Sequence, residues 1–104
     1  MSSQHREAFE EFAEKAQEEL GDSLKKLVLY GSVAKGQESE ESDVDVFAVV
    51  ESQEQKERLE DLAFDVSVEH GVFIVPVIKT VEEFEESKDS LFSREVMETG
   101  DIRV

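Results

Sequence analysis

Seven consecutive residues, 44–50, read Val-Asp-Val-Phe-Ala-Val-Val and constrain the fold more than any other segment. A run this apolar predicts a strand that is covered on both faces, not one with a solvated side. Further apolar runs at 27–30 and 72–78 predict two more strands. We therefore expect a small sheet enclosed by other elements.

Helical patterns occupy the segments between these strands. Residues 4–20 carry Phe, Ala and Leu at helical spacing, and residues 52–70 repeat the pattern after a Ser-x-x-Gln capping box. A second capping box at 80–83 predicts a short helix, another short helix follows Ser90, and 101–104 is predicted as a terminal strand.

The order of the elements predicts the topology of the sheet. The short segment 31–42 allows the first two strands to pair antiparallel, whereas the helix at 52–70 is a crossover that makes the second and third strands parallel. Pro76 cannot donate a ladder hydrogen bond, so the third strand is expected at an edge. The predicted class is α/β (α+β), a small mixed sheet of three to four strands packed by helices.

The chain is strongly acidic. Its 104 residues include 27 Asp and Glu but only 11 Lys and Arg, for a net charge of -16. This balance opposes direct binding to a nucleic-acid backbone, because phosphates are held by Lys and Arg. The acid excess favours either simple solubility or a halophilic adaptation, and the second interpretation predicts loss of structure when salt is removed.

Other classes are excluded or disfavoured by what the sequence lacks. It has no cysteine, and therefore no disulfide framework, thiolate metal site or catalytic thiol. No apolar run approaches the roughly 20 residues of a membrane span, and the first residues do not resemble a signal peptide. We expect a cytoplasmic protein that does not contact a membrane.

Segment 29–45 contains the residues that could bind a ligand or take part in catalysis. Gly31 and Ser32 follow a predicted strand, where a glycine lets backbone approach a ligand and a hydroxyl suits a phosphate. Asp43 and Asp45 are two residues apart at the start of the next strand, so both carboxylates lie on one face and could hold Mg²⁺. Antiparallel pairing would bring the two groups to one rim. Lys35 lies between them and could bind a phosphate.

Simpler interpretations exist for each feature. Gly-Ser after a strand is commonly only a turn, the acidic run at 38–45 is typical of a solvated loop, and Lys35 could be an ordinary surface lysine. The joint spacing, Gly-Ser followed after ten residues by Asp-x-Asp, favours the functional interpretation.

This pattern resembles the nucleotidyltransferase superfamily of the DNA polymerase β type, and in particular the minimal nucleotidyltransferases that accompany HEPN-domain partners. Gly31, Ser32, Asp43 and Asp45 match the signature. The resemblance implies a single nucleotidyltransferase-like domain over residues 1–104. It also implies that Mg²⁺ (or Mn²⁺) and a nucleoside triphosphate, usually ATP, are bound, and that the partner is a HEPN-type protein, as in antitoxins that adenylylate their toxin.

One departure bears on activity. Active members of the superfamily carry a third carboxylate on the next strand, and residues 71–78 contain no acid. Asp65 and Glu69, on the preceding helix, are read as exposed helix acids that would substitute only in an unusual geometry. Two hypotheses therefore remain. One is an enzyme that transfers a nucleotidyl group, which the resemblance implies is adenylyl, to a hydroxyl on another molecule. The other is a weak or inactive antitoxin-like module that masks a HEPN-type partner.

Overall fold

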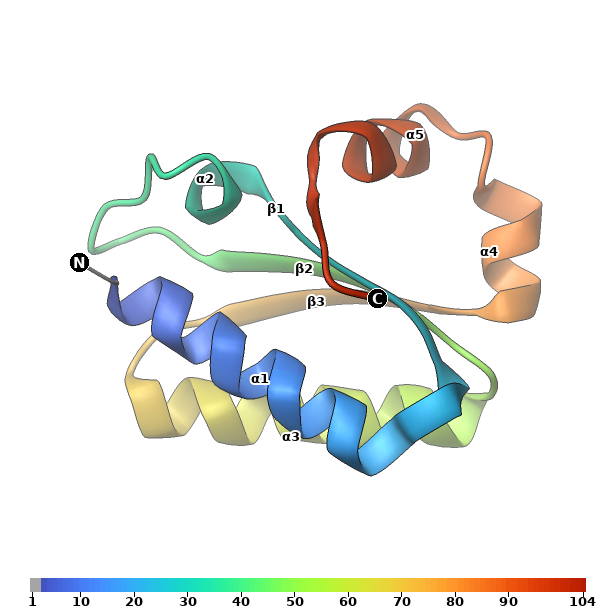
Figure 1. The fold of residues 1–104 in the computed structure, drawn as a ribbon, viewed down its shortest axis with the longest axis horizontal. Coiled ribbons are helices and arrows are strands. Elements are labelled where there is room, and N and C mark those ends of the chain that lie inside the picture. The colour runs from blue at the N-terminus through green and yellow to red at the C-terminus, as the bar shows by residue number, and fades with distance from the viewer. Residues whose placement is uncertain (1–2) are drawn as a thin grey trace.

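The computed structural model describes residues 3–104 (Figure 1). Helices and strands alternate in an order close to that predicted. The elements are α1 (Gln4–Leu20), a 3-10 turn (Gly21–Ser23), β1 (Leu24–Tyr30), α2 (Gly31–Ala34), β2 (Val44–Val50), α3 (Gln53–His70), β3 (Ile74–Thr80), α4 (Val81–Ser87), α5 (Leu91–Thr99) and β4 (Asp101–Ile102).

The four strands form one mixed sheet in the order β3-β2-β1-β4. β1 pairs antiparallel with β2 and with β4, whereas β2 and β3 are parallel across the α3 crossover. Both pairings predicted from the sequence are confirmed. Pro76 lies in β3, an outer strand of the sheet, so its predicted edge position is confirmed as well.

Side chains of β2 alternate between two apolar clusters, which confirms that this strand is covered on both faces. Val44, Val46, Ala48 and Val50 pack under α1 and α3 in the larger cluster. Phe47 and Val49 belong to a smaller cluster with residues of α4 and α5 on the opposite face. Figure 1 shows these two helical layers below and above the sheet.

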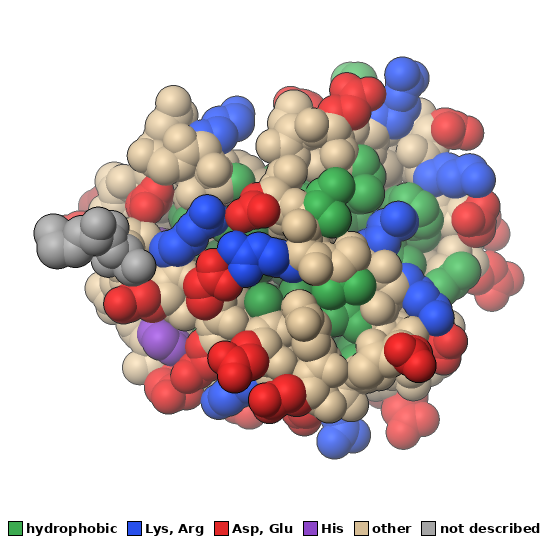
Figure 2. Space-filling model, in the orientation of Figure 1, with side chains coloured by type: hydrophobic (Ala, Val, Ile, Leu, Met, Phe, Trp, Pro, Cys, Tyr) green, Lys and Arg blue, Asp and Glu red, His purple; other side chains and the backbone are tan. Residues whose placement is uncertain are grey.

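The second layer is short, and it leaves one end of its sheet face partly open. Tyr30 at the end of β1 and Asp45 at the start of β2 are only partly buried there, and Val75 in β3 is exposed. Figure 2 shows a notch in the molecular outline between α2 and the segment that leads from α5 into β4. This end of the sheet is therefore accessible to a ligand.

Over the described residues 3–104, no helix has the length and apolar character needed to cross a membrane. Acidic side chains appear around much of the outline in Figure 2.

Candidate active site

The antiparallel register of β1 and β2 places the Gly-Ser turn beside the aspartates. Tyr30, the last residue of β1, is paired with Asp45, and Gly31 begins α2 immediately afterwards. Asp43 directly precedes β2 and is exposed to solvent. The expected juxtaposition of the Gly-Ser turn and the start of β2 is confirmed for Asp45.

Gly31 and Asp45 are in direct contact. A Cβ atom added to Gly31 would lie 2.3 Å from Oδ2 of Asp45, far inside the distance at which two such atoms can coexist. The backbone of Gly31 also has a φ of 77°, in the left-handed region that favours glycine. Two independent constraints therefore require glycine here, and one of them is the carboxylate itself.

Ser32 occupies the first turn of α2 and is half-buried. Its carbonyl oxygen accepts a 2.9 Å hydrogen bond from the amide of Gln37, which folds the following loop back on the helix. This hydrogen bond fixes the course of the loop after the Gly-Ser turn.

The two aspartates interact electrostatically. Burial raises the pKa of Asp45, and the negative charge of Asp43 raises it further. A pair of nearby carboxylates that repel each other is a donor set suited to a hard divalent cation, which removes the repulsion on binding. Asp43 and Asp45 are thus the residues on this face that could hold Mg²⁺.

An aromatic pair borders the carboxylates, and half of it was missed by sequence reasoning. Tyr30 has its pKa raised by burial and by the charge of Asp45. Phe92 of α5 contacts the Tyr30 ring edge-on, with centroids 5.6 Å apart. No local sequence pattern predicts this contact, because the two residues are 62 positions apart.

The neighbour of Asp45 on the next strand is not an acid. The parallel register pairs Asp45 with Val75, which is 40% exposed. Neither helix acid can take its place, because α3 packs on the other face of the sheet. Asp65 there lines a hollow with other acids, and Glu69 forms an ion pair with Lys15.

Lys35 lies at the C-terminal end of α2 and is exposed. It lines a hollow of about 580 Å³ together with Ser3, Arg6 and Glu38, between α2 and the N-terminal end of α1. Its role as a phosphate ligand stays a prediction.

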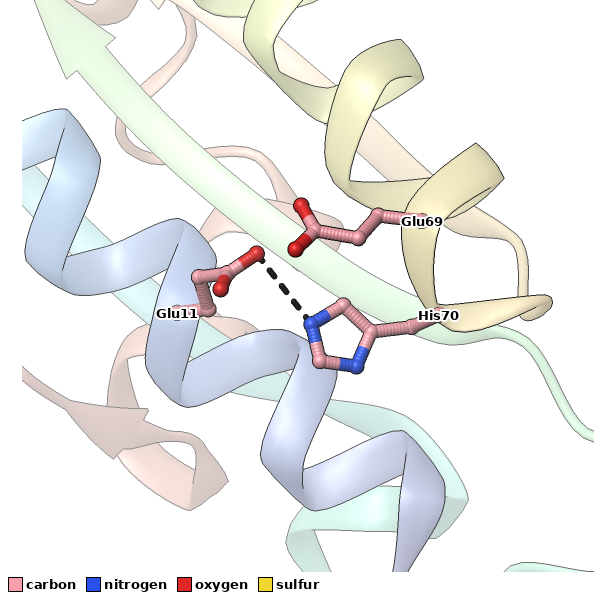
Figure 3. Close-up of side chains that lie close together, drawn as sticks. All are labelled: Glu11, Glu69 and His70. Carbon is pink, nitrogen blue, oxygen red and sulfur yellow. Dashed lines mark hydrogen bonds and ion pairs between the residues drawn. The ribbon is translucent and has the colours of Figure 1, made fainter.

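A second cluster of potential metal ligands joins α1 to α3. Glu11, Glu69 and His70 each bring one ligand atom within 4.8 Å of the others (Figure 3). His70 Nε2 lies 3.2 Å from Glu11 Oε2, and the ammonium of Lys15 lies 3.7 and 3.8 Å from the two carboxylates. The positive charge of Lys15 already offsets the carboxylates of Glu11 and Glu69. We therefore interpret this cluster as a set of ion pairs that connects α1 to α3.

Known proteins are similar to this chain in sequence and in fold. The profile of the nucleotidyltransferase domain family matches residues 6–100. Two candidate protein adenylyltransferases of Methanocaldococcus jannaschii are similar. MJ0604 is 30% identical over 95 residues, covering 91% of this chain and 93% of the relative, and MJ0141 is 33% identical over 75 residues, covering 69% and 76%.

A solved structure also has a similar fold. A chain from the crystal structure of a toxin-antitoxin with AMP-PNP superposes with a TM-score of 0.63 at 17% identity, covering 89% of this chain and 70% of that one. With a profile match over nearly the whole sequence, and a Gly-Ser turn in contact with an Asp-x-Asp strand, the chain belongs to the nucleotidyltransferase domain family.

Proposed function

We propose that this chain transfers an adenylyl group from magnesium-bound ATP to a hydroxyl group of a partner protein. The observation that carries the proposal is the contact between Gly31 and the Asp45 carboxylate, because it brings the turn that would bind phosphate beside the carboxylates that would hold the metal. The candidate protein adenylyltransferases among its relatives support both the nucleotide and the class of acceptor. We place the activity in the cytoplasm, where ATP is available.

In this reaction the acceptor oxygen forms a bond to the α-phosphorus, and the bond from that phosphorus to the bridging oxygen breaks. Pyrophosphate leaves, and the hydroxyl proton passes to a base. Asp43 and Asp45 would hold Mg²⁺, which when bound neutralises phosphate charge. The amides and hydroxyl of the Gly31-Ser32 turn would bind the β- and γ-phosphates, with Lys35 as an additional cation.

The strand position beside Asp45 does not provide a group that could accept the proton of the attacking hydroxyl. Val75 occupies the position beside Asp45 on the next strand, and a valine cannot take a proton. We propose that the partner, a HEPN-type protein by family resemblance, brings the base together with the acceptor hydroxyl. The isolated chain would then bind nucleotide but transfer it slowly.

Transfer assays with ATP labelled at different phosphates test this function. The chain is incubated in high salt with Mg²⁺, the product of the neighbouring gene and ATP labelled at either the α- or the γ-phosphate. We expect only the α label on the partner, and no transfer by Asp43→Asn or Asp45→Asn. Asp61→Asn, the same chemical change at an exposed position of α3, is the matched control and retains transfer.

Nucleotide binding is measured separately by thermal denaturation. A ligand at 100 times its Kd raises the free energy of unfolding by about 2.7 kcal/mol. The chain should gain this stabilisation from Mg²⁺ and ATP together, and the two aspartate variants should not. Transfer that persists in both variants, or no stabilisation of the unaltered chain, would overturn the proposal. Tight binding of the partner without transfer would instead identify a masking module.

A further inference from the structure

An apolar groove runs between α3 and the edge strand β3. It has a volume of about 510 Å³, and most of its lining is hydrophobic, including Ala63, Phe64, Val68, Val72, Phe73 and Ile74. None of the residues proposed to bind metal or phosphate lines it.

Three large side chains of this groove are mostly in solvent. The exposed fractions are 69% for Phe64, 67% for Val68 and 74% for Phe73. Phe64 and Val68 are four residues apart, so they form one stripe along α3. Contiguous exposed apolar surface on an otherwise highly charged chain is typical of an interaction site.

The backbone of β3 is closed to strand addition. The amide of Val44 donates to the carbonyl of Phe73 over 2.8 Å, and the alternation of a parallel pair then turns the amide positions of residues 74, 76 and 78 toward the open edge. The amide of Ile74 already donates to Oγ of Ser67 at 2.9 Å, and Pro76 has no N–H. An incoming strand would find two of these three donors missing.

A partner must therefore dock through side chains, which favours a helix laid in the groove. The charge around the groove further limits which partner could bind there. Glu60 lines the groove, and a second hollow on α3 is lined by Glu54, Glu57, Asp61 and Asp65 around a single cation, Arg58. A second copy would bring the same acids and another charge of -16 to this contact, whereas a basic partner would be attracted.

We propose that the groove between α3 and β3 binds an amphipathic helix of a partner protein, with an apolar stripe seated on Phe64, Val68 and Phe73 and Lys or Arg along its flanks. Val75, beside Asp45, lies on the same edge strand as the groove. A helix bound there would lie on the α3 side of this strand, whereas Asp45 and Val75 lie on the opposite face of the sheet. The proposal does not depend on transfer activity.

Titration of the isotope-labelled chain with synthetic helices tests the groove. One peptide carries Leu at helical spacing with Lys elsewhere on its flanks, and a matched peptide carries Glu in place of Lys. Amide spectra report where each binds, and fluorescence anisotropy reports affinity. The variants are Phe64→Ser with Val68→Ser, the matched control Leu91→Ser at an 83% exposed site on α5, and Asp45→Asn.

We expect saturable shifts along residues 60–76 with the Lys peptide. Affinity should be at least about tenfold lower for the groove variant, since burying one Phe alone contributes that much. Affinity should also be lower for the Glu peptide, because the acids of α3 repel its charges. Leu91→Ser and Asp45→Asn should bind normally, so that failure of the catalytic proposal remains distinguishable. Unchanged affinity in the groove variant, or shifts spread over the whole acidic surface, would refute the proposal. Self-association of the free chain that Phe64→Ser abolishes would assign the groove to a second copy and refute it too.

Discussion

Substitution of Gly31 by alanine tests the contact with Asp45 that defines the candidate active site. The left-handed backbone at φ 77° costs an alanine about 1–2 kcal/mol. The new Cβ also meets Oδ2 of Asp45 at 2.3 Å and forces that side chain off its rotamer, which adds about 0.5–1.5 kcal/mol. We expect Gly31→Ala to lose roughly 1.5–3.5 kcal/mol of unfolding free energy.

Gly36→Ala is the matched control. Gly36 has a nearly equal φ of 70°, but a Cβ there would meet no atom within 4 Å. It should therefore lose only the backbone part, about 1–2 kcal/mol. Urea denaturation of both variants measures the difference, and removal of the Asp45 carboxylate in Gly31→Ala/Asp45→Ala should recover part of it. Equal losses for Gly31→Ala and Gly36→Ala would show that the carboxylate does not press on the turn.

Four further outcomes follow from the structure. Because the folded-state pKa of Asp45 is raised, its ionised form opposes folding; Asp45→Asn should raise the melting temperature at pH 7, and the gain should shrink as the pH falls through the raised pKa. Val75→Asp, which places an acid beside Asp45, should increase the rate of adenylyl transfer in the α-label assay; an unchanged rate would mean that this position is not the missing acid. Phe47→Ala should cost about 3–5 kcal/mol in urea denaturation, because Phe47 is fully buried, whereas Leu91→Ala at the surface should stay within about 0.5 kcal/mol. If the acid excess is halophilic, circular dichroism should show unfolding as salt is dialysed away, and a fold retained at low salt would leave solubility as its explanation.

The fold could be predicted where hydrophobic patterning and loop length act locally. The bounds of β2 and α1 are those expected, and the parallel and antiparallel pairings are confirmed. The limits of β1 and β3 were wrong, because polar lysines and a threonine extend both strands: β1 begins at Leu24 and β3 continues to Thr80. The capping box at Thr80 is confirmed, but the one at Ser52 is wrong, since that hydroxyl contacts the side chain of Gln55 instead of a backbone amide.

The candidate site was predictable to the extent that it depends on strand register. Gly31 and Asp45 meet because antiparallel pairing brings the end of one strand to the start of the next. The contact of Phe92 with Tyr30 depends on how α5 folds back over the sheet, which no local pattern encodes. The exposure of Phe64 and Phe73 could not be predicted either. The sequence shows which residues are apolar, but not which of them remain in contact with solvent. The catalytic roles stay predictions.

Because of the position of β2, the two parts of the candidate site should open at different rates. β2 is bonded to strands on both sides, so the amides around Asp45 should exchange their hydrogens only when the whole molecule opens. The Gly-Ser turn begins a single short helical turn followed by an exposed loop, and such segments open by themselves far more often. Asp45 is thus held in place by the sheet, while the Gly-Ser turn beside it can open locally without loosening that carboxylate.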